Sequence, residues 1–180
     1  MVRHARRPAG FTLIELMVGI AIMALLLLAA APYTLDWVDG TRQLRARSNL
    51  LEAVGQARAL AMRNPRALTA DQAVEGAAAV VYDNATHTLW VVARTSDGSG
   101  WDAFGAAGDW RGQIANPASL ALAGGAADDA ADFVCAAFDT RGALVDSSYE
   151  GAACTAPVAG AAASVFIKVG SQEAMDVALL

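Results

Sequence analysis

A single carboxylate stands near the start of a long apolar stretch. Glu15 is followed, from Leu16 to Ala31, only by residues without polar side chains. A charged carboxylate at the centre of a bilayer costs roughly 2.5–3.5 kcal/mol, so such a group is functional by default and calls for a cationic partner. The sequence therefore makes Glu15 the first candidate functional residue, with ion pairing as its expected chemistry.

The apolar stretch has the length of a membrane-spanning helix. Residues 11–31 would extend about 30 Å as an α-helix, the thickness of the hydrocarbon core of a bilayer. Arg3, Arg6 and Arg7 precede this stretch, and a long net-acidic region follows it. The positive-inside rule then places the N-terminus in the cytoplasm and the rest across the membrane. An ordinary secretory signal, cut after Ala29-Ala30-Ala31, and a plain single-pass anchor are simpler readings, but neither explains a carboxylate inside the stretch.

The junction between the basic segment and the apolar stretch carries a resemblance to a known family. It reads Gly10-Phe11-Thr12-Leu13-Ile14-Glu15-Leu16, and it resembles the leader of type IV pilins and type II secretion pseudopilins. The resemblance implies that a prepilin peptidase cuts between Gly10 and Phe11 and that Phe11 is then N-methylated. It also implies that Glu15 pairs with the N-terminal amine of a neighbouring subunit during assembly. Pro32 matches the family's helix break.

Four segments are expected along the chain: a leader peptide at 1–10, a transmembrane helix at 11–32, an amphipathic periplasmic helix at 33–66, and a β-rich globular head at 67–180. The amphipathic helix carries an apolar stripe at helical spacing and ends at Asn64-Pro65. Short β-prone runs follow at 78–82 with 88–92, at 132–138, and at 164–169 with 173–179, and 119–122 is a weaker candidate strand. The predicted fold class is α+β: a long N-terminal helix packed on an antiparallel β-sheet head.

Cys135 and Cys154 are the two cysteines of the chain, and both lie in the head. Two thiols on the oxidising side of a membrane favour a disulfide. On the chain-entropy model, closing this loop contributes about 3 kcal/mol. Two free buried cysteines are the alternative, because spacing alone does not establish pairing.

No catalytic arrangement stands out in the sequence. His87 is the one histidine beyond the leader, and the serines and acids have no partner that would complete a triad. The acidic clusters at 97–102 and 128–132 lack the spaced pattern of an EF-hand. We therefore expect no enzyme activity, no cofactor and no metal site. From residue 67 to 180, fourteen acidic side chains face four basic ones, a net charge of −10, which disfavours nucleic acid as a partner.

The order of elements narrows the resemblance to the GspH/FimT group of minor pilins and pseudopilins. Trp101 in a Gly-rich loop and the turn Phe138-Asp139-Thr140-Arg141-Gly142 fit that plan. The resemblance implies an H-like minor pseudopilin near the tip of a periplasmic filament, with the chain spanning the bacterial inner membrane once and the head in the periplasm. Its expected partners are other minor and major pseudopilins, the prepilin peptidase, the inner-membrane assembly platform and the membrane.

Two other functions remain open. The first is a FimT-like minor pilin of a type IV pilus, with a role in pilus assembly or DNA uptake. The DNA-uptake members of that group carry a Gly-Arg-x-Arg type motif near the C-terminus, where this chain has Gly170-Ser171-Gln172-Glu173. The second is a membrane-anchored periplasmic binding domain whose leader-like start is fortuitous.

Overall fold

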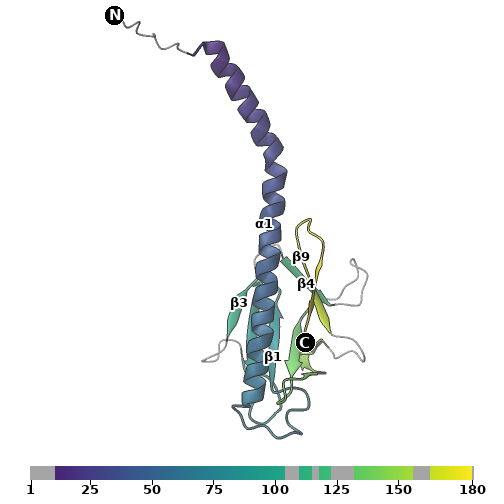
Figure 1. Cartoon of the computed structure of the whole chain (residues 1–180). Coiled ribbons are helices and arrows are strands. Elements are labelled where there is room, and N and C mark those ends of the chain that lie inside the picture. Colours follow the sequence, from purple (N-terminus) through teal and green to yellow (C-terminus); the bar gives the residue numbers. More distant parts are fainter. Residues whose placement is uncertain (1–10, 104–109, 115–117, 123–131, 156–162, 180) are drawn as a thin grey trace, which may run out of the picture. The chain divides into compact units, whose positions relative to one another are not determined.

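The computed structural model describes residues 11–103, 110–114, 118–122, 132–155 and 163–179 (Figure 1). The chain divides into two compact units, Met1–Val38 and Asp39–Leu180. The described residues form one long helix, α1 (Leu13–Arg63), followed by short antiparallel strands. This α+β, pilin-like arrangement confirms the predicted fold class.

The start of α1 is fixed by a side-chain cap. Thr12 precedes the first helical residue, and its Oγ1 accepts a hydrogen bond from the backbone N–H of Glu15 at 3.3 Å. The pattern Thr12-Leu13-Ile14-Glu15 has the sequence of a capping box, but only its first half is formed among the described residues: the Thr12 hydroxyl accepts from the Glu15 N–H, and the Glu15 carboxylate makes no return bond. A carboxylate in the first turn also interacts favourably with the helix dipole.

The first part of α1 is long and apolar enough to cross a membrane, by length and composition. Its large apolar side chains between Phe11 and Leu28 are exposed in the isolated chain. The helix runs through Pro32 without ending, so the helix break expected at this residue is wrong as a statement about secondary structure. A proline removes one backbone donor and crowds one carbonyl, and a helix can absorb both by bending rather than stopping.

In the second unit, α1 buries the predicted apolar stripe against the sheets. The stripe residues lie in or against the main core, as expected from their spacing: Ala46, Leu50, Ala53, Val54, Ala57, Leu60 and Ala61. The helix ends at Arg63, and Asn64 follows with a positive φ of 42°. The Asn64 side chain then closes the turn, since its Oδ1 accepts from the N–H of Leu68 at 2.9 Å. The predicted stop at Asn64-Pro65 is confirmed.

The larger sheet has the order β3-β2-β1-β5-β6. Its strands are β1 (Ala78–Asp83), β2 (Thr88–Ala93), β3 (Arg111–Gln113), β5 (Cys135–Phe138) and β6 (Leu144–Val145). The predicted hairpin is β1–β2, with Ala78 opposite Ala93 and Asp83 opposite Thr88. Strand β1 is central and pairs with both β2 and β5.

A three-stranded sheet, ordered β10-β9-β4, forms the rest of the main core. It consists of β4 (Ala118–Leu122), β9 (Ser164–Val169) and β10 (Met175–Ala178). The predicted terminal hairpin is β9–β10. Strands β7 (Ser148–Tyr149) and β8 (Ala152–Ala153) make a separate small hairpin.

Both faces of β1 are buried, and each faces a different apolar cluster. Ala78, Val80 and Tyr82 belong to the main core with the helix stripe. Ala79 and Val81 point to the opposite face, into a smaller cluster that the β7–β8 region covers. We call this second set the outer cluster: Ala79, Val81, Val92, Cys135, Ala137, Tyr149 and Cys154. Alternation along a strand explains why neighbouring residues enter different clusters.

Polar side chains of α1 fix the sheets to the helix. Gln43 is 5 % exposed, and its Nε2 donates to the carbonyls of Ile167 at 2.8 Å and Glu173 at 2.7 Å. Asn49 donates to the carbonyl of Gln113 at 2.7 Å. The helix therefore holds the β9–β10 hairpin and strand β3 by directional bonds as well as by apolar packing.

Candidate functional site

The N-terminal candidate site consists of Phe11, Thr12 and Glu15 at the start of α1. Phe11 is 84 % exposed, and Glu15 is also exposed. Within the part of the chain that the structure describes, the Glu15 carboxylate has no hydrogen-bond or ion-pair partner. The Thr12 cap holds the backbone of Glu15, so the first turn presents an unpaired carboxylate on an apolar helix. Gly10, the expected cleavage residue, lies outside the described residues.

Cys135 and Cys154 form a disulfide, as predicted. Cys135 begins β5, and Cys154 directly follows β8. The backbone N–H of Thr155 also donates to the Cys135 carbonyl at 2.7 Å. The covalent bond therefore attaches the β7–β8 hairpin to the outer face of the larger sheet, where it covers the outer cluster.

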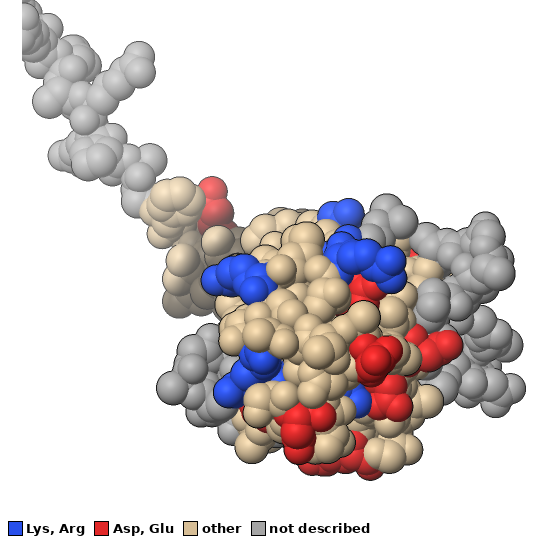
Figure 2. Space-filling model, turned by 90° about the horizontal axis from the view of Figure 1, so that it is seen from below, with Lys and Arg blue, Asp and Glu red and all other residues tan. Residues whose placement is uncertain are grey.

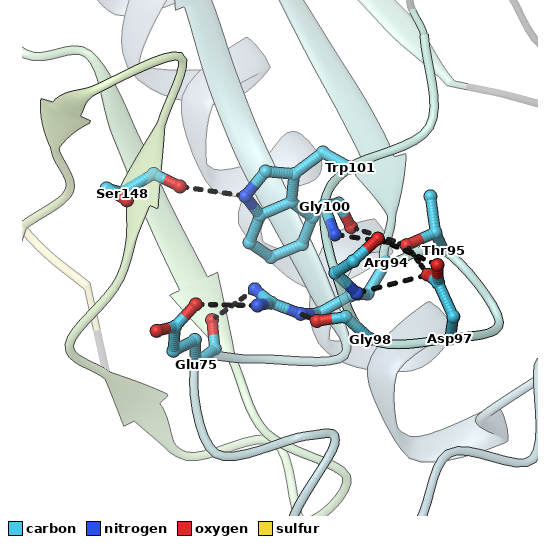
Figure 3. Close-up of polar contacts among 9 residues, drawn as sticks. Glu75, Arg94, Thr95, Asp97, Gly98, Gly100, Trp101 and Ser148 are labelled. Atoms are coloured by element: carbon cyan, nitrogen blue, oxygen red, sulfur yellow. Dashed lines mark hydrogen bonds and ion pairs between the residues drawn. The ribbon is translucent and has the colours of Figure 1, made fainter.

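A second candidate site surrounds Trp101 on the head (Figure 3). The Arg94 side chain is 6 % exposed, and its guanidinium carbon lies 5.1 Å from the centroid of the Trp101 ring. Its Nη2 pairs with Glu75 Oε2 at 2.6 Å, and its Nε donates to the Gly98 carbonyl at 3.0 Å. The Trp101 indole N–H donates to the carbonyl of Ser148 at 2.8 Å. Trp101 thus joins the loop after β2 to the β7–β8 hairpin.

The loop between Arg94 and Trp101 is closed by Asp97. Its carboxylate accepts from the Thr95 hydroxyl at 2.6 Å, and from the Ser99 hydroxyl at 2.8 Å and N–H at 3.1 Å. These bonds, that of Thr95 first, lower the pKa of Asp97 from its ordinary value to about 2. Hydrogen bonds to the ionised form are the cause, since they favour the charged carboxylate.

Trp110, the other tryptophan between β2 and β3, contributes to the packing of the head. The Trp110 indole N–H donates to Glu52 Oε1 at 3.1 Å, and its ring packs against the main core. The structure places Trp110 against the helix, and it places Trp101 against the outer cluster with part of its surface accessible.

Charge is unevenly distributed over the head. Figure 2 shows acidic side chains gathered along one side of the visible surface and basic ones mostly along the other. Several of the basic residues belong to α1, where Arg45 and Arg47 are exposed. Among the described residues, no three His, Cys, Asp or Glu side chains are grouped as metal ligands. The acidic pair Asp128-Asp129 lies outside the described residues.

The described part of α1 begins with a capped, apolar segment that carries a lone carboxylate, and its later part packs on antiparallel sheets. This is a pilin-like arrangement. Residues 5–31 match the family described as "Prokaryotic N-terminal methylation motif". This match supports a type IV pilin-like protein, and it implies processing by a prepilin peptidase and assembly into pilus-like filaments. No curated protein and no solved structure gives a significant match.

Proposed function

We propose that this protein is a minor pseudopilin of a type II secretion system, a structural subunit near the tip of the periplasmic filament. The observation that carries the proposal is the methylation motif at residues 5–31 with Glu15 unpaired in an otherwise apolar first turn. The chain would act by assembly rather than by catalysis, anchored once in the inner membrane with its head in the periplasm.

Glu15 supplies the assembly contact in this proposal. In a bundle of apolar helices, an unpaired carboxylate is costly, so it should find a cation. The methylated amine of Phe11 on a neighbouring subunit offers that cation once Gly10 is removed. The ion pair would set the register of each subunit against the next.

A charge-removal experiment tests the assembly role. Glu15→Ala should insert into the membrane and fold but fail to co-purify with its partner subunits, and secretion should fall. Glu173→Ala removes an exposed carboxylate of the head and serves as the matched control. Normal assembly of Glu15→Ala would show that the ion-pair account does not hold.

The alternative is a FimT-like minor pilin of a type IV pilus. Neighbouring genes for a secretin and a secretion ATPase, as opposed to pilus genes, would favour the secretion role. A salt-titrated DNA-binding assay addresses DNA uptake directly. Because residues 67–180 carry a net charge of −10, we expect no appreciable binding to duplex DNA at physiological salt. Micromolar, salt-sensitive binding would favour the alternative.

A further inference from the structure

A cleft of about 390 Å³ opens on the head beside Trp101. Its walls come from the turn before β1, the loop after β2 and the β7–β8 hairpin. They include Glu75, Arg94, Trp101, Asp102, Tyr149 and Glu150. Neither the proposed anchor nor the proposed assembly contact uses this cleft. Its two aromatic and three acidic side chains are the chemistry to explain.

The cleft already contains one cationic side chain, that of Arg94, and its guanidinium group is hydrogen-bonded within the protein. Arg94 is nearly buried, and each of its guanidinium nitrogens donates to Glu75 or Gly98. Because the same guanidinium stacks on Trp101, the indole is held in place before any partner arrives (Figure 3). The ring is preorganised, and this reduces the ordering cost of binding.

Two of the three carboxylates remain accessible. The Glu75 side chain is 60 % exposed in spite of its bond to Arg94, and the exposed Glu150 has no ion pair in the described structure. Asp102 differs, because its carboxylate pairs with Arg66 at 2.5 Å. Glu150 and Gly151 form the tight turn of the β7–β8 hairpin, with φ values of 51° and 84°. Such a turn fixes Glu150 at the rim of the cleft.

Carboxylates beside an aromatic surface select a cation. A guanidinium group can form charge-assisted hydrogen bonds to carboxylates and lie against an indole at the same time. Among the described residues at the cleft, Glu150 is the carboxylate without an ion pair, and the nearby Arg94 and Arg66 are both paired. An anionic ligand would therefore meet an unpaired carboxylate and no unpaired basic group of the described residues. The net charge of −10 over residues 67–180 attracts the same kind of partner at longer range.

We propose that the Trp101 cleft receives an arginine side chain from a helix of a neighbouring filament subunit. This inference rests on the proposed function, which supplies the neighbouring subunit as the partner. The choice of an arginine is based on charge complementarity. The helix of this chain shows what such a partner presents, because Arg45 and Arg47 are exposed and have no ion pair within the described residues. The cleft would thus recognise a basic helix, separately from the Glu15 contact.

The test uses the full chain in detergent micelles, with ¹⁵N-labelled tryptophan. The probe is a peptide of residues 42–48, Arg-Gln-Leu-Arg-Ala-Arg-Ser, and its control carries citrulline in place of each arginine. We expect the Trp101 indole resonance, assigned with Trp101→Phe, to shift with the arginine peptide and not with the control. Glu150→Gln should weaken binding about three- to tenfold, and Glu173→Gln should leave it unchanged.

Three results would overturn the proposal: equal shifts with the citrulline peptide, equal affinity in Glu150→Gln, or no shift of Trp101 at millimolar peptide. Since the Glu150 side chain has no hydrogen bond or ion pair within the described residues, its replacement by Gln should not unfold the head. If the peptide experiment gives one of these results while the leader is still processed and the subunit still assembles, only the cleft proposal is contradicted. Failure of processing would contradict the proposed function itself.

Discussion

In the proposed function, Glu15 takes part in both local structure and assembly. Its backbone N–H is bonded to the Thr12 hydroxyl, and its position in the first turn favours the helix dipole. The sequence indicated the functional side of this residue through its isolation among apolar neighbours. The capping role was missed, although Thr-x-x-Glu is itself a readable signal. Local capping leaves the carboxylate unpaired, so both roles are compatible.

The lowered pKa of Asp97 leads to a prediction of how the loop beside Trp101 responds to acid. Its pKa is lowered from 3.8 to about 2, so its hydrogen bonds stabilise the loop fully above pH 3.8 and are lost as the pH falls through about 2. We expect the Asp97 side-chain carboxyl resonance to titrate near pH 2, and the Thr95 and Ser99 amide shifts to follow it. Asp97→Asn should abolish that transition. A midpoint near 4 would contradict the hydrogen-bond account.

Among the elements, the bond between α1 and the β9–β10 hairpin depends on Gln43. Gln43→Ala removes the donor for two carbonyls, those of Ile167 and Glu173. Leaving buried acceptors unpaired costs about 1–3 kcal/mol, so we expect the free energy of unfolding to fall by that amount in chemical denaturation. Arg45→Ala, on the exposed face of the same helix, should change it by less than about 0.5 kcal/mol. Equal effects would show that the Gln43 contacts contribute little.

The disulfide is expected to act on the outer cluster rather than on the main core. Replacing Cys135 and Cys154 together by Ser should lower stability by about 3 kcal/mol. It should also loosen the β7–β8 hairpin, which is otherwise held to the loop after β2 by the Trp101–Ser148 hydrogen bond. Hydrogen exchange would then accelerate at Ser148–Thr155 and stay slow in the helix stripe at Leu50 and Ala57. Uniform acceleration would mean that the two clusters unfold as one unit.

The elements that sequence reasoning found are those with long, regular patterns. The helix stripe from Ala46 to Ala61 has helical spacing, and β1, β2 and β9 are six-residue runs rich in β-branched residues. Strands β6, β7 and β8 have two residues each, too few to show an alternation. The pairing of these short strands depends on tertiary contacts, so the local sequence pattern did not predict them. The helix break predicted at Pro32 was wrong because a proline can be accommodated within a helix, and α1 continues through this residue.

Some of the candidate sites could be predicted from the sequence, and one could not. Glu15 and the disulfide followed from residue type and compartment. The cleft did not, because it brings together Glu75, Arg94, Trp101 and Glu150 from three separate stretches of the chain. Only the placement of Trp101 in a loop hinted at it. A buried arginine between an indole and a carboxylate is a product of the tertiary fold.

At the scale of the whole molecule, we propose that the chain is a processed, pilin-like subunit anchored by its first helix. Processing should require a small residue at position 10, because a side chain there would crowd the scissile bond. Gly10→Val should therefore keep the full-length precursor in the membrane, and it provides the control for the wild-type measurement.

The most direct measurement is the intact mass of the wild-type protein extracted from bacterial membranes, with its N-terminus confirmed by peptide sequencing. We expect the loss of residues 1–10 and the gain of one methyl group on the amine of Phe11. A chain that begins at Met1, or one that begins just after Ala31, would contradict the account.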